Sequence, residues 1–316
     1  MKNGTLNLKS KKLPQKHGRE NSIRILQRDI LFFFVTMTII LFITGYELKL
    51  IQTELLIKNI ERSDINYDAF REFRFCDGVF QKAEVKAANV IKKNPELKNM
   101  PYIDGIGYLT FSMMARSYDL LELELADETT FFRGIGPIGK TTAFQELYDY
   151  YNAVLVDLEY FPVPKIQEET ADINYADTWN QLRSYGGNRR HEGTDLMASN
   201  NKRGFFPIIS ITDGIVEKKG WLEQGGYRIG IRSEAGGYFY YAHLDSYAPE
   251  LEQGDSVIAG QLLGFMGDSG YGSEGTIGEF DVHLHMGIYV KTITGEISIN
   301  PYWILRILEK NRTIYN

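Results

Sequence analysis

Four of the five histidines lie in three short strings of the C-terminal half, and their spacing suits the binding of a metal ion. The first string, R-R-H-E-G-T-D, contains His191 and Asp195, which are separated by a bend at Gly193. The last string, D-V-H-L-H-M-G-I-Y, contains His283 and His285. Imidazole nitrogens and carboxylate oxygens are ligands that zinc prefers, so these strings predict a metal site.

A catalytic zinc ion takes three protein ligands and leaves a fourth position for water. His191, Asp195 and one of the two histidines of H-L-H supply that number. Two neutral imidazoles and one carboxylate leave the zinc site with a charge of about +1, which polarises water and a carbonyl group. The candidates for the base and the oxyanion stabiliser are His243, in Y-F-Y-Y-A-H-L-D, and the remaining histidine of H-L-H.

The string H-E-G-T-D also allows a different assignment. A helical H-E-x-x-H motif whose last histidine is replaced by Asp195 would make Glu192 the general base. Gly193 and Thr194 are poor helix formers, and the residues around them lack an apolar stripe. The helical assignment is therefore disfavoured.

Short strands separated by glycine turns are the elements expected to position these residues. Strands are predicted at 227–232 and 238–243. In the last string every second residue is apolar, which places both histidines on the opposite strand face, ~7 Å apart. These apolar residues are Val282, Leu284, Met286 and Ile288.

At these residues the chain resembles the lysostaphin-type, or LytM-like, zinc metallopeptidases of bacterial cell walls. The pattern of that family is H-x-x-x-D, then a central histidine after an aromatic strand, then H-x-H. The sequence reads H-E-G-T-D at 191–195, Y-A-H-L at 241–244 and H-L-H at 283–285, and the resemblance covers about residues 177–303. Glycine-rich strings such as T-D-G-I-V-E and G-Y-R-I-G-I-R are similar to the family as well.

The resemblance implies that His191, Asp195 and His285 bind one zinc ion per chain. It implies that His243 and His283 orient the water and stabilise the oxyanion. It also implies a mostly antiparallel β-sheet domain with a groove over the metal, and a peptidoglycan peptide as substrate. The stretch 270–282 is longer than the S-T-G-P run common in the family, so the resemblance does not determine the rim of the cleft or the choice of substrate.

An uncharged apolar run extends from Ile30 to Tyr46, and as a helix it would be ~25 Å long. Eight basic and two acidic residues precede it, which places the N-terminus in the cytoplasm and the rest of the chain outside. No A-x-A-like cleavage site follows the run. We therefore expect an uncleaved, single-pass anchor in the cell membrane, with the lipid bilayer as a partner of residues 30–46.

The middle of the chain carries mainly helical patterns, including a helix expected to end before Asn94-Pro95. The string G-I-G-P-I-G-K-T at 134–141 matches the phosphate-loop pattern, yet no buried apolar strand precedes it. A glycine and proline turn that opens a helix at Thr141 or Thr142 is the preferred interpretation. The string F-P-V-P at 161–164 breaks regular structure and predicts a linker.

The expected organisation is therefore a basic cytoplasmic tail at 1–29, a transmembrane anchor at 30–46, a mainly helical extracytoplasmic region at 47–165, a linker at 166–176 and a LytM-like zinc metallopeptidase domain at 177–316. The net charge is -6, although the tail is basic. A basic tail on an acidic body argues against nucleic acid as a partner. The single cysteine, Cys76, excludes an intrachain disulfide.

Two functions remain open at this point. The first is a membrane-anchored zinc endopeptidase that hydrolyses peptide bonds of peptidoglycan. The alternative is a non-catalytic LytM-like scaffold or activator in division or sporulation, since some relatives keep the fold and lose metal ligands. The complete ligand set favours the enzyme.

Overall fold

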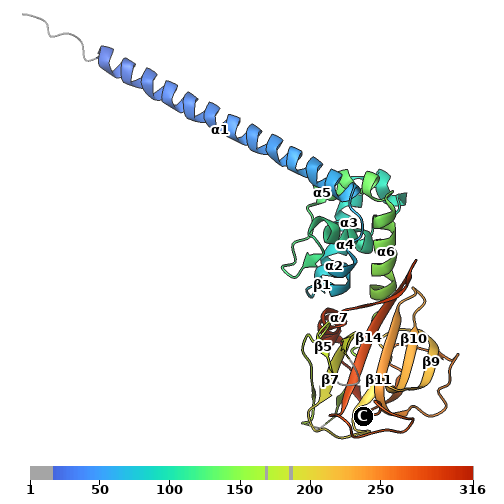
Figure 1. The fold of residues 1–316 in the computed structure, drawn as a ribbon. Coiled ribbons are helices and arrows are strands. Elements are labelled where there is room, and N and C mark those ends of the chain that lie inside the picture. Colours follow the sequence, from blue (N-terminus) through green and yellow to red (C-terminus); the bar gives the residue numbers. More distant parts are fainter. Residues whose placement is uncertain (1–16, 168–169, 185–187, 316) are drawn as a thin grey trace, which may run out of the picture. The chain divides into compact units, whose positions relative to one another are not determined.

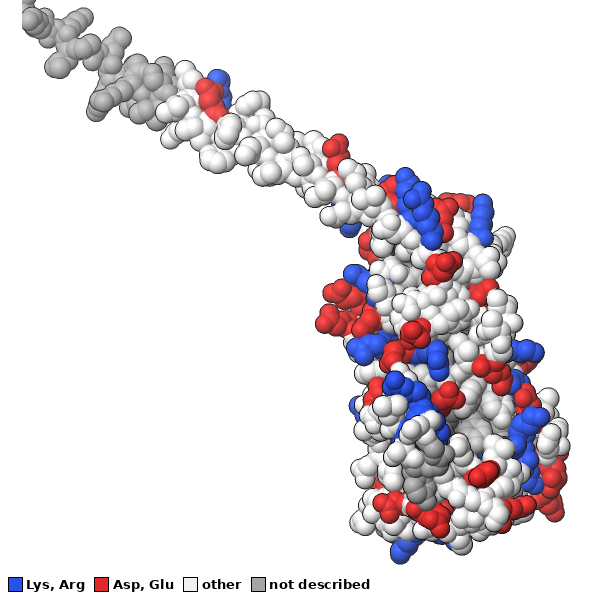
Figure 2. Space-filling view, in the orientation of Figure 1, with Lys and Arg blue, Asp and Glu red and all other residues white. Residues whose placement is uncertain are grey.

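The computed structural model describes residues 17–167, 170–184 and 188–315. The chain divides into two compact units, Met1–Leu56 and Ile57–Asn316. Helix α1 (His17–Glu61) makes up the described part of the first unit and ends in the second. Its segment Arg24–Glu61 is apolar and long enough to cross a membrane, and its most apolar window contains no buried residue. Figure 2 shows an almost uncharged surface over much of this helix.

The second unit begins with a group of helices around α4. These elements are α2 (Tyr67–Glu72), α3 (Val79–Lys93), η1 (Pro95–Asn99), α4 (Gly105–Ala115), α5 (Glu128–Ile138) and α6 (Thr142–Leu155), with a short parallel pair of β1 (Arg74–Phe75) and β2 (Asp119–Leu120). Helix α4 is buried from Gly105 to Met114. Glycine is required at Gly107, because a Cβ there would lie 2.0 Å from the carbonyl oxygen of Tyr102.

Two predictions for this region can be compared with the helices. Helix α3 ends at Lys93, and Asn94 is its C-cap, as expected. Thr141 caps α6 by accepting a hydrogen bond from the amide of Phe144, which confirms the expected start of that helix. Gly134 and Gly136 of the phosphate-loop pattern lie within helix α5, and Gly139 follows as its C-cap in the turn before α6. The amide of Gly139 donates to the carbonyl of Ile135, so it is not available to surround a phosphate.

Ten strands form one sheet among the described residues, and all of its pairs are antiparallel. The path is β12-β9-β10-β11-β14-β7-β4; β13 pairs with β11 and β8, and β15 pairs with β14. The bounds are β4 (Ile173–Asn174), β7 (Thr194–Ala198), β8 (Pro207–Ile209), β9 (Gly214–Leu222), β10 (Gly226–Arg232), β11 (Tyr238–Tyr247), β12 (Ser256–Val257), β13 (Leu262–Met266), β14 (His283–Thr292) and β15 (Gly295–Ile299). Figure 1 shows the long strands in one layer.

The arrangement of elements is therefore the expected one: an apolar N-terminal helix, several further helices and a C-terminal, antiparallel sheet. The strands predicted at 227–232 and 238–243 are β10 and β11. On β14 the apolar side chains of Leu284, Met286 and Ile288 are fully buried. This alternation leaves the opposite face of β14 for its two histidines.

Smaller elements join the helices to the sheet within the second unit. They are β3 (Lys165–Ile166) paired with β16 (Ile314–Tyr315), β5 (Leu182–Arg183) paired with β6 (Arg189–Arg190), α7 (Tyr302–Leu308) and η2 (Glu309–Asn311). Arg71 of α2 donates hydrogen bonds of 2.8 and 2.9 Å to the carbonyl and hydroxyl of Ser298 on β15. The stretch 166–176, expected as a linker, contains β4, which pairs with β7, and Phe161 and Val163 before it are buried.

Candidate metal and catalytic site

Strands β7, β14 and β11 bring the candidate residues to one face of the sheet. Asp195 on β7 is paired in register with His285 on β14. His285 is in turn paired with Ala242 on β11, which precedes His243. His191 lies in the segment between β6 and β7. Antiparallel pairing therefore brings together residues that are about 90 positions apart in the sequence.

Three of these residues direct one ligand atom each toward a common point. Oδ1 of Asp195 lies 3.1 Å from Nε2 of His191 and 3.0 Å from Nδ1 of His285, and the two nitrogens are 3.1 Å apart. His191, Asp195 and His285 form a group that could hold a metal ion. Tetrahedral ligands at about 2.0–2.1 Å from zinc lie roughly 3.3 Å from one another, so the observed spacing fits such an ion.

The protonation states of Asp195 and His285 also favour the binding of a cation. Burial raises the pKa of the Asp195 carboxyl, but hydrogen bonds to His191 and His285 outweigh it and hold that pKa well below its usual range. Burial lowers the pKa of His285 despite the nearby carboxylate. At neutral pH the site therefore has an ionised carboxylate and a neutral His285 imidazole, the forms that bind metal ions.

The second nitrogen of three imidazoles is fixed by a backbone carbonyl. Nδ1 of His191 lies 3.0 Å from the carbonyl oxygen of Thr178. Nδ1 of His243 lies 2.8 Å from the carbonyl oxygen of Ser269, and Nδ1 of His283 lies 2.7 Å from that of Asp281. A proton on Nδ1 donated to each carbonyl leaves Nε2 with a free lone pair.

His243 and His283 lie next to the three-residue group. The ring centroids of His243 and His283 are 4.7 Å apart, and Nε2 of His283 lies 3.8 Å from Oδ1 of Asp195. The ring of His243 is 5.9 Å from that of His285. Burial, followed by the neighbouring histidines, lowers the pKa of His243 well below its ordinary value, so its imidazole is neutral at pH 7.

The stretch 270–282 forms a wall beside these histidines. Phe280 meets the ring of His243 edge-on with centroids 4.7 Å apart, and Tyr271 stacks against it at 6.0 Å. Arg189 donates a hydrogen bond to the hydroxyl of Tyr271. The stretch 270–282 therefore supplies two aromatic side chains to the site.

Glu192 does not lie in a helix, because β7 begins two residues later. Its side chain is exposed and lies 3.9 Å from the guanidinium of Arg71. Gly193 is buried, and a Cβ there would lie 2.5 Å from Cε1 of His285. The helical H-E-x-x-H assignment is therefore wrong for this chain.

Several residues of the site could not be recognised from the sequence. Arg183 on β5 donates a 2.7 Å hydrogen bond to Oδ2 of Asp195, and Thr178, Ser269 and Asp281 act through backbone carbonyls. The side-chain types of the last three give no information about a backbone contact. Arg183 could have been suspected only as a cation near the first histidine string.

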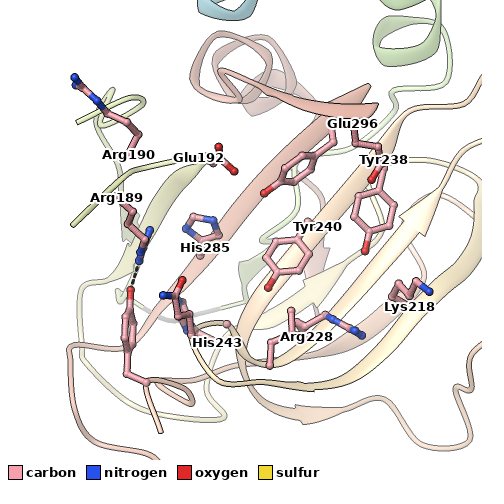
Figure 3. A pocket seen from close by; sticks show the side chains of 15 residues that line it. Arg189, Arg190, Glu192, Lys218, Arg228, Tyr238, Tyr240, His243, His285 and Glu296 are labelled. Carbon is pink, nitrogen blue, oxygen red and sulfur yellow. Dashed lines mark hydrogen bonds between the residues drawn. The ribbon is translucent and has the colours of Figure 1, made fainter. Parts of the chain in front are cut away.

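A cavity of about 590 Å³ opens beside the ligand group, and His243 and His285 are part of its lining (Figure 3). Tyr240 follows His285 along this lining, with ring centroids 6.1 Å apart, and Tyr289 lies 6.3 Å beyond it. A smaller cavity of about 230 Å³ contains the three candidate ligands together with His243 and His283. The site is thus open to a ligand much larger than water.

Two curated bacterial enzymes are similar to this chain. The L-Ala–D-Glu endopeptidase of Bacillus subtilis (strain 168) is 38% identical over 180 residues, which are 57% of this chain and 53% of that protein. A glycyl-glycine endopeptidase of Staphylococcus capitis is 26% identical over 150 residues, which are 44% of this chain and 38% of that protein. The chain thus spans about half, or less, of the length of these relatives.

The crystal structure of a LytM protein from Ruminococcus gnavus superposes with a TM-score of 0.63 at 40% identity. The match covers 82% of this chain and 98% of that chain, so it includes most of the helical region as well as the sheet. The sequence model of Peptidase family M23 matches residues 189–301, which contain every histidine and the aspartate described above. This chain therefore belongs to peptidase family M23.

Proposed function

We propose that the protein is a zinc endopeptidase that hydrolyses peptide bonds of bacterial peptidoglycan with metal-activated water. The observation that carries the proposal is the convergence of Asp195 Oδ1, His191 Nε2 and His285 Nδ1 within 3.1 Å of one another. The names of the two endopeptidase relatives support the substrate class. A complete ligand set also favours an enzyme over a non-catalytic scaffold.

In this proposal His191, Asp195 and His285 hold the zinc ion, one per chain. Zinc bound there would polarise a water molecule and the scissile carbonyl. His243 and His283 are the catalytic neighbours, because each donates Nδ1–H to a carbonyl and keeps Nε2 free. Such an imidazole accepts a proton from water at Nε2 and then, as a cation, donates to the developing oxyanion or to the leaving amine.

We further propose that residues 30–46 anchor the protein in the cell membrane, with 1–29 in the cytoplasm and the rest outside. The apolar helix α1 and the basic residues before the span support this orientation. The regions 47–165, 166–176 and 177–316 then lie on the side of the cell wall. Digestion of intact spheroplasts with an added protease tests the topology, since only the C-terminal regions should be cut.

Digestion of purified cell walls tests the activity directly. The full-length protein, purified in detergent and loaded with zinc, should release muropeptides whose masses identify the cut bond. Treatment with a chelator should stop the release, and added zinc should restore it. The His283→Ala variant is the matched control for contaminating hydrolases, and walls that stay intact under all conditions would contradict the proposal.

A further inference from the structure

The cavity beside the metal site has an unbalanced charge. Its basic lining residues are Arg189, Arg190, Lys218 and Arg228, and its acidic lining residues are Glu192 and Glu296. Both acidic residues already have basic neighbours: Glu192 lies 3.9 Å from Arg71, and Glu296 accepts a 2.5 Å hydrogen bond from Arg232. The basic residues of the lining therefore carry more positive charge than its acidic residues can neutralise.

Arg228 is one of the basic lining residues that have no counterion among the residues that the structure describes. Its Nη1 is buried and has no hydrogen-bond partner, and its side chain makes no ion pair within the described part of the chain. A buried N–H without a partner destabilises the folded chain, and more so when the group is charged. In the view of Figure 3, Arg228 projects between His243 and Lys218.

The backbone directs Arg228 into the cavity. Ile229 and Ile231 of β10 are fully buried, so the alternation of the strand places Arg228 on its opposite face. Gly230, which shares that face, pairs with Tyr240 of β11, and Tyr240 also lines the cavity. The alternation of β10 thus accounts for an arginine that faces the cavity.

The tyrosines around Arg228 do not serve as its counterion. Burial raises the pKa of Tyr238 to about 12, although Arg228 acts in the opposite direction. Burial likewise raises the pKa of Tyr240. Both phenols are therefore neutral at pH 7 and offer only hydroxyl groups. The positive charge of the lining would then be balanced by an anionic group of the ligand.

We propose that Arg228 binds a free carboxylate of the substrate, which makes the protein selective for peptides with an acidic residue next to the cut bond. The inference rests on the proposed function and narrows it. A guanidinium presents two parallel N–H groups that match the two oxygens of a carboxylate. An internal glutamate has a second carboxyl group that stays ionised at pH 7, whereas a bridge made of glycine has no charged side chain for Arg228 to bind.

Binding measured without catalysis tests the inference. The probes are the tripeptide alanyl-D-glutamyl-lysine, whose glutamate keeps one free carboxylate, and the same tripeptide with that carboxylate converted to a carboxamide. Calorimetry with the full-length, metal-free protein gives Kd for each probe. We expect the carboxylate probe to bind about 10- to 100-fold more tightly, the range for a hydrogen-bonded charged pair.

The variant Arg228→Gln should lose this preference and bind both probes with the affinity that the wild type has for the carboxamide. Arg228→Lys should keep part of the preference, because lysine keeps the positive charge but lacks the two parallel N–H groups of the guanidinium. Arg116→Gln, which alters an exposed arginine of the helical region, is the matched control and should keep the full preference. The Tm of Arg228→Gln should not fall, since the side chain loses no partner.

An unchanged preference in Arg228→Gln would overturn the inference, and so would equal or unmeasurable binding of both probes by the wild type. These outcomes are separate from those of the wall digestion. A protein that prefers the carboxylate probe but never cuts walls would contradict only the proposed hydrolysis. A protein that cuts walls and ignores the carboxylate would contradict only the role of Arg228.

Discussion

Arg183 and Asp195 are joined by a 2.7 Å hydrogen bond from Nη2 to Oδ2, which leaves Oδ1 of the carboxylate to face His191 and His285. The same Nη2 lies 3.0 Å from Nδ1 of His191, which donates its proton to the carbonyl of Thr178. The guanidinium therefore orients one of the three candidate ligands, Asp195. Residues that orient ligands in this way usually affect metal affinity without touching the ion.

Replacing Arg183 with glutamine should weaken zinc binding about 10- to 100-fold, because the carboxylate loses the donor that fixes its rotation. Competition with a chromogenic chelator measures the affinity. Arg190→Gln is the matched control, since Arg190 lies on the paired strand β6 and its guanidinium donates to the carbonyl of Asn180 instead. Equal zinc affinity in both variants would show that Arg183 does not contribute to zinc binding.

The variants His191→Ala and Asp195→Ala should each lose both zinc and activity. Each removes one of only three protein ligands, and two remaining ligands rarely hold zinc in competition with buffer. Elemental analysis of the purified variants gives the zinc content. Full occupancy in either variant would show that its residue is not a ligand.

The two histidines of β14 should behave differently. His285→Ala should be purified without zinc, because Nδ1 of His285 belongs to the three-atom group. His283→Ala should keep its zinc and lose activity, since its Nε2 lies 3.8 Å from Asp195 and next to His243. The reverse pattern would exchange the two roles, and zinc loss in both would make both histidines ligands.

His243→Ala should keep its zinc and lose most of its turnover. The loss of an acid, base or oxyanion donor lowers the rate by about 10²–10³. A steady-state assay on a soluble muropeptide, together with zinc analysis of the same sample, checks both parts. Turnover close to that of the wild type would show that His243 has no part in the chemistry.

The stability of the metal-free protein should fall as the pH drops below about 6.5, the ordinary value for histidine. The pKa of buried His243 lies well below its ordinary value in the folded chain, so the unfolded chain takes up a proton first. This contribution to the free energy of unfolding is fully present above pH 6.5 and declines as the pH falls. Thermal melts between pH 7.5 and 5.5 measure it, and His243→Gln should show a smaller decline.

Most of the candidate site could be predicted from the sequence, because its residues are of types that commonly bind metal ions. The alternation of apolar and polar residues along 282–288 predicted the face that His283 and His285 share, and β14 has that pattern. Alternation is a local property of a strand, so it can be read without knowledge of the partner strands.

The supporting contacts were not predictable, because they depend on pairing between distant segments. Arg183 reaches Asp195 from β5, a two-residue strand with no periodicity to detect. Alternation places Arg228 on the face of β10 opposite the buried Ile229 and Ile231, but the cavity on that face forms only when β10 pairs with β11. The phosphate-loop pattern at 134–141 shows the opposite problem, since its spacing matches the motif although the residues form the end of α5, a turn and the N-cap of α6.

Gly193 has no functional group, yet it lies against Cε1 and Nε2 of the His285 ring. A Cβ there would be 2.5 Å from Cε1, 2.6 Å from Nε2 and 2.6 Å from the carbonyl oxygen of Met286. Any side chain at this position must push the imidazole or the strand aside. In an alanine scan, Gly193→Ala should therefore lose activity as fully as the loss of a zinc ligand does. The cause is steric, because the position has room only for a hydrogen atom, and the result would not indicate a catalytic role for Gly193.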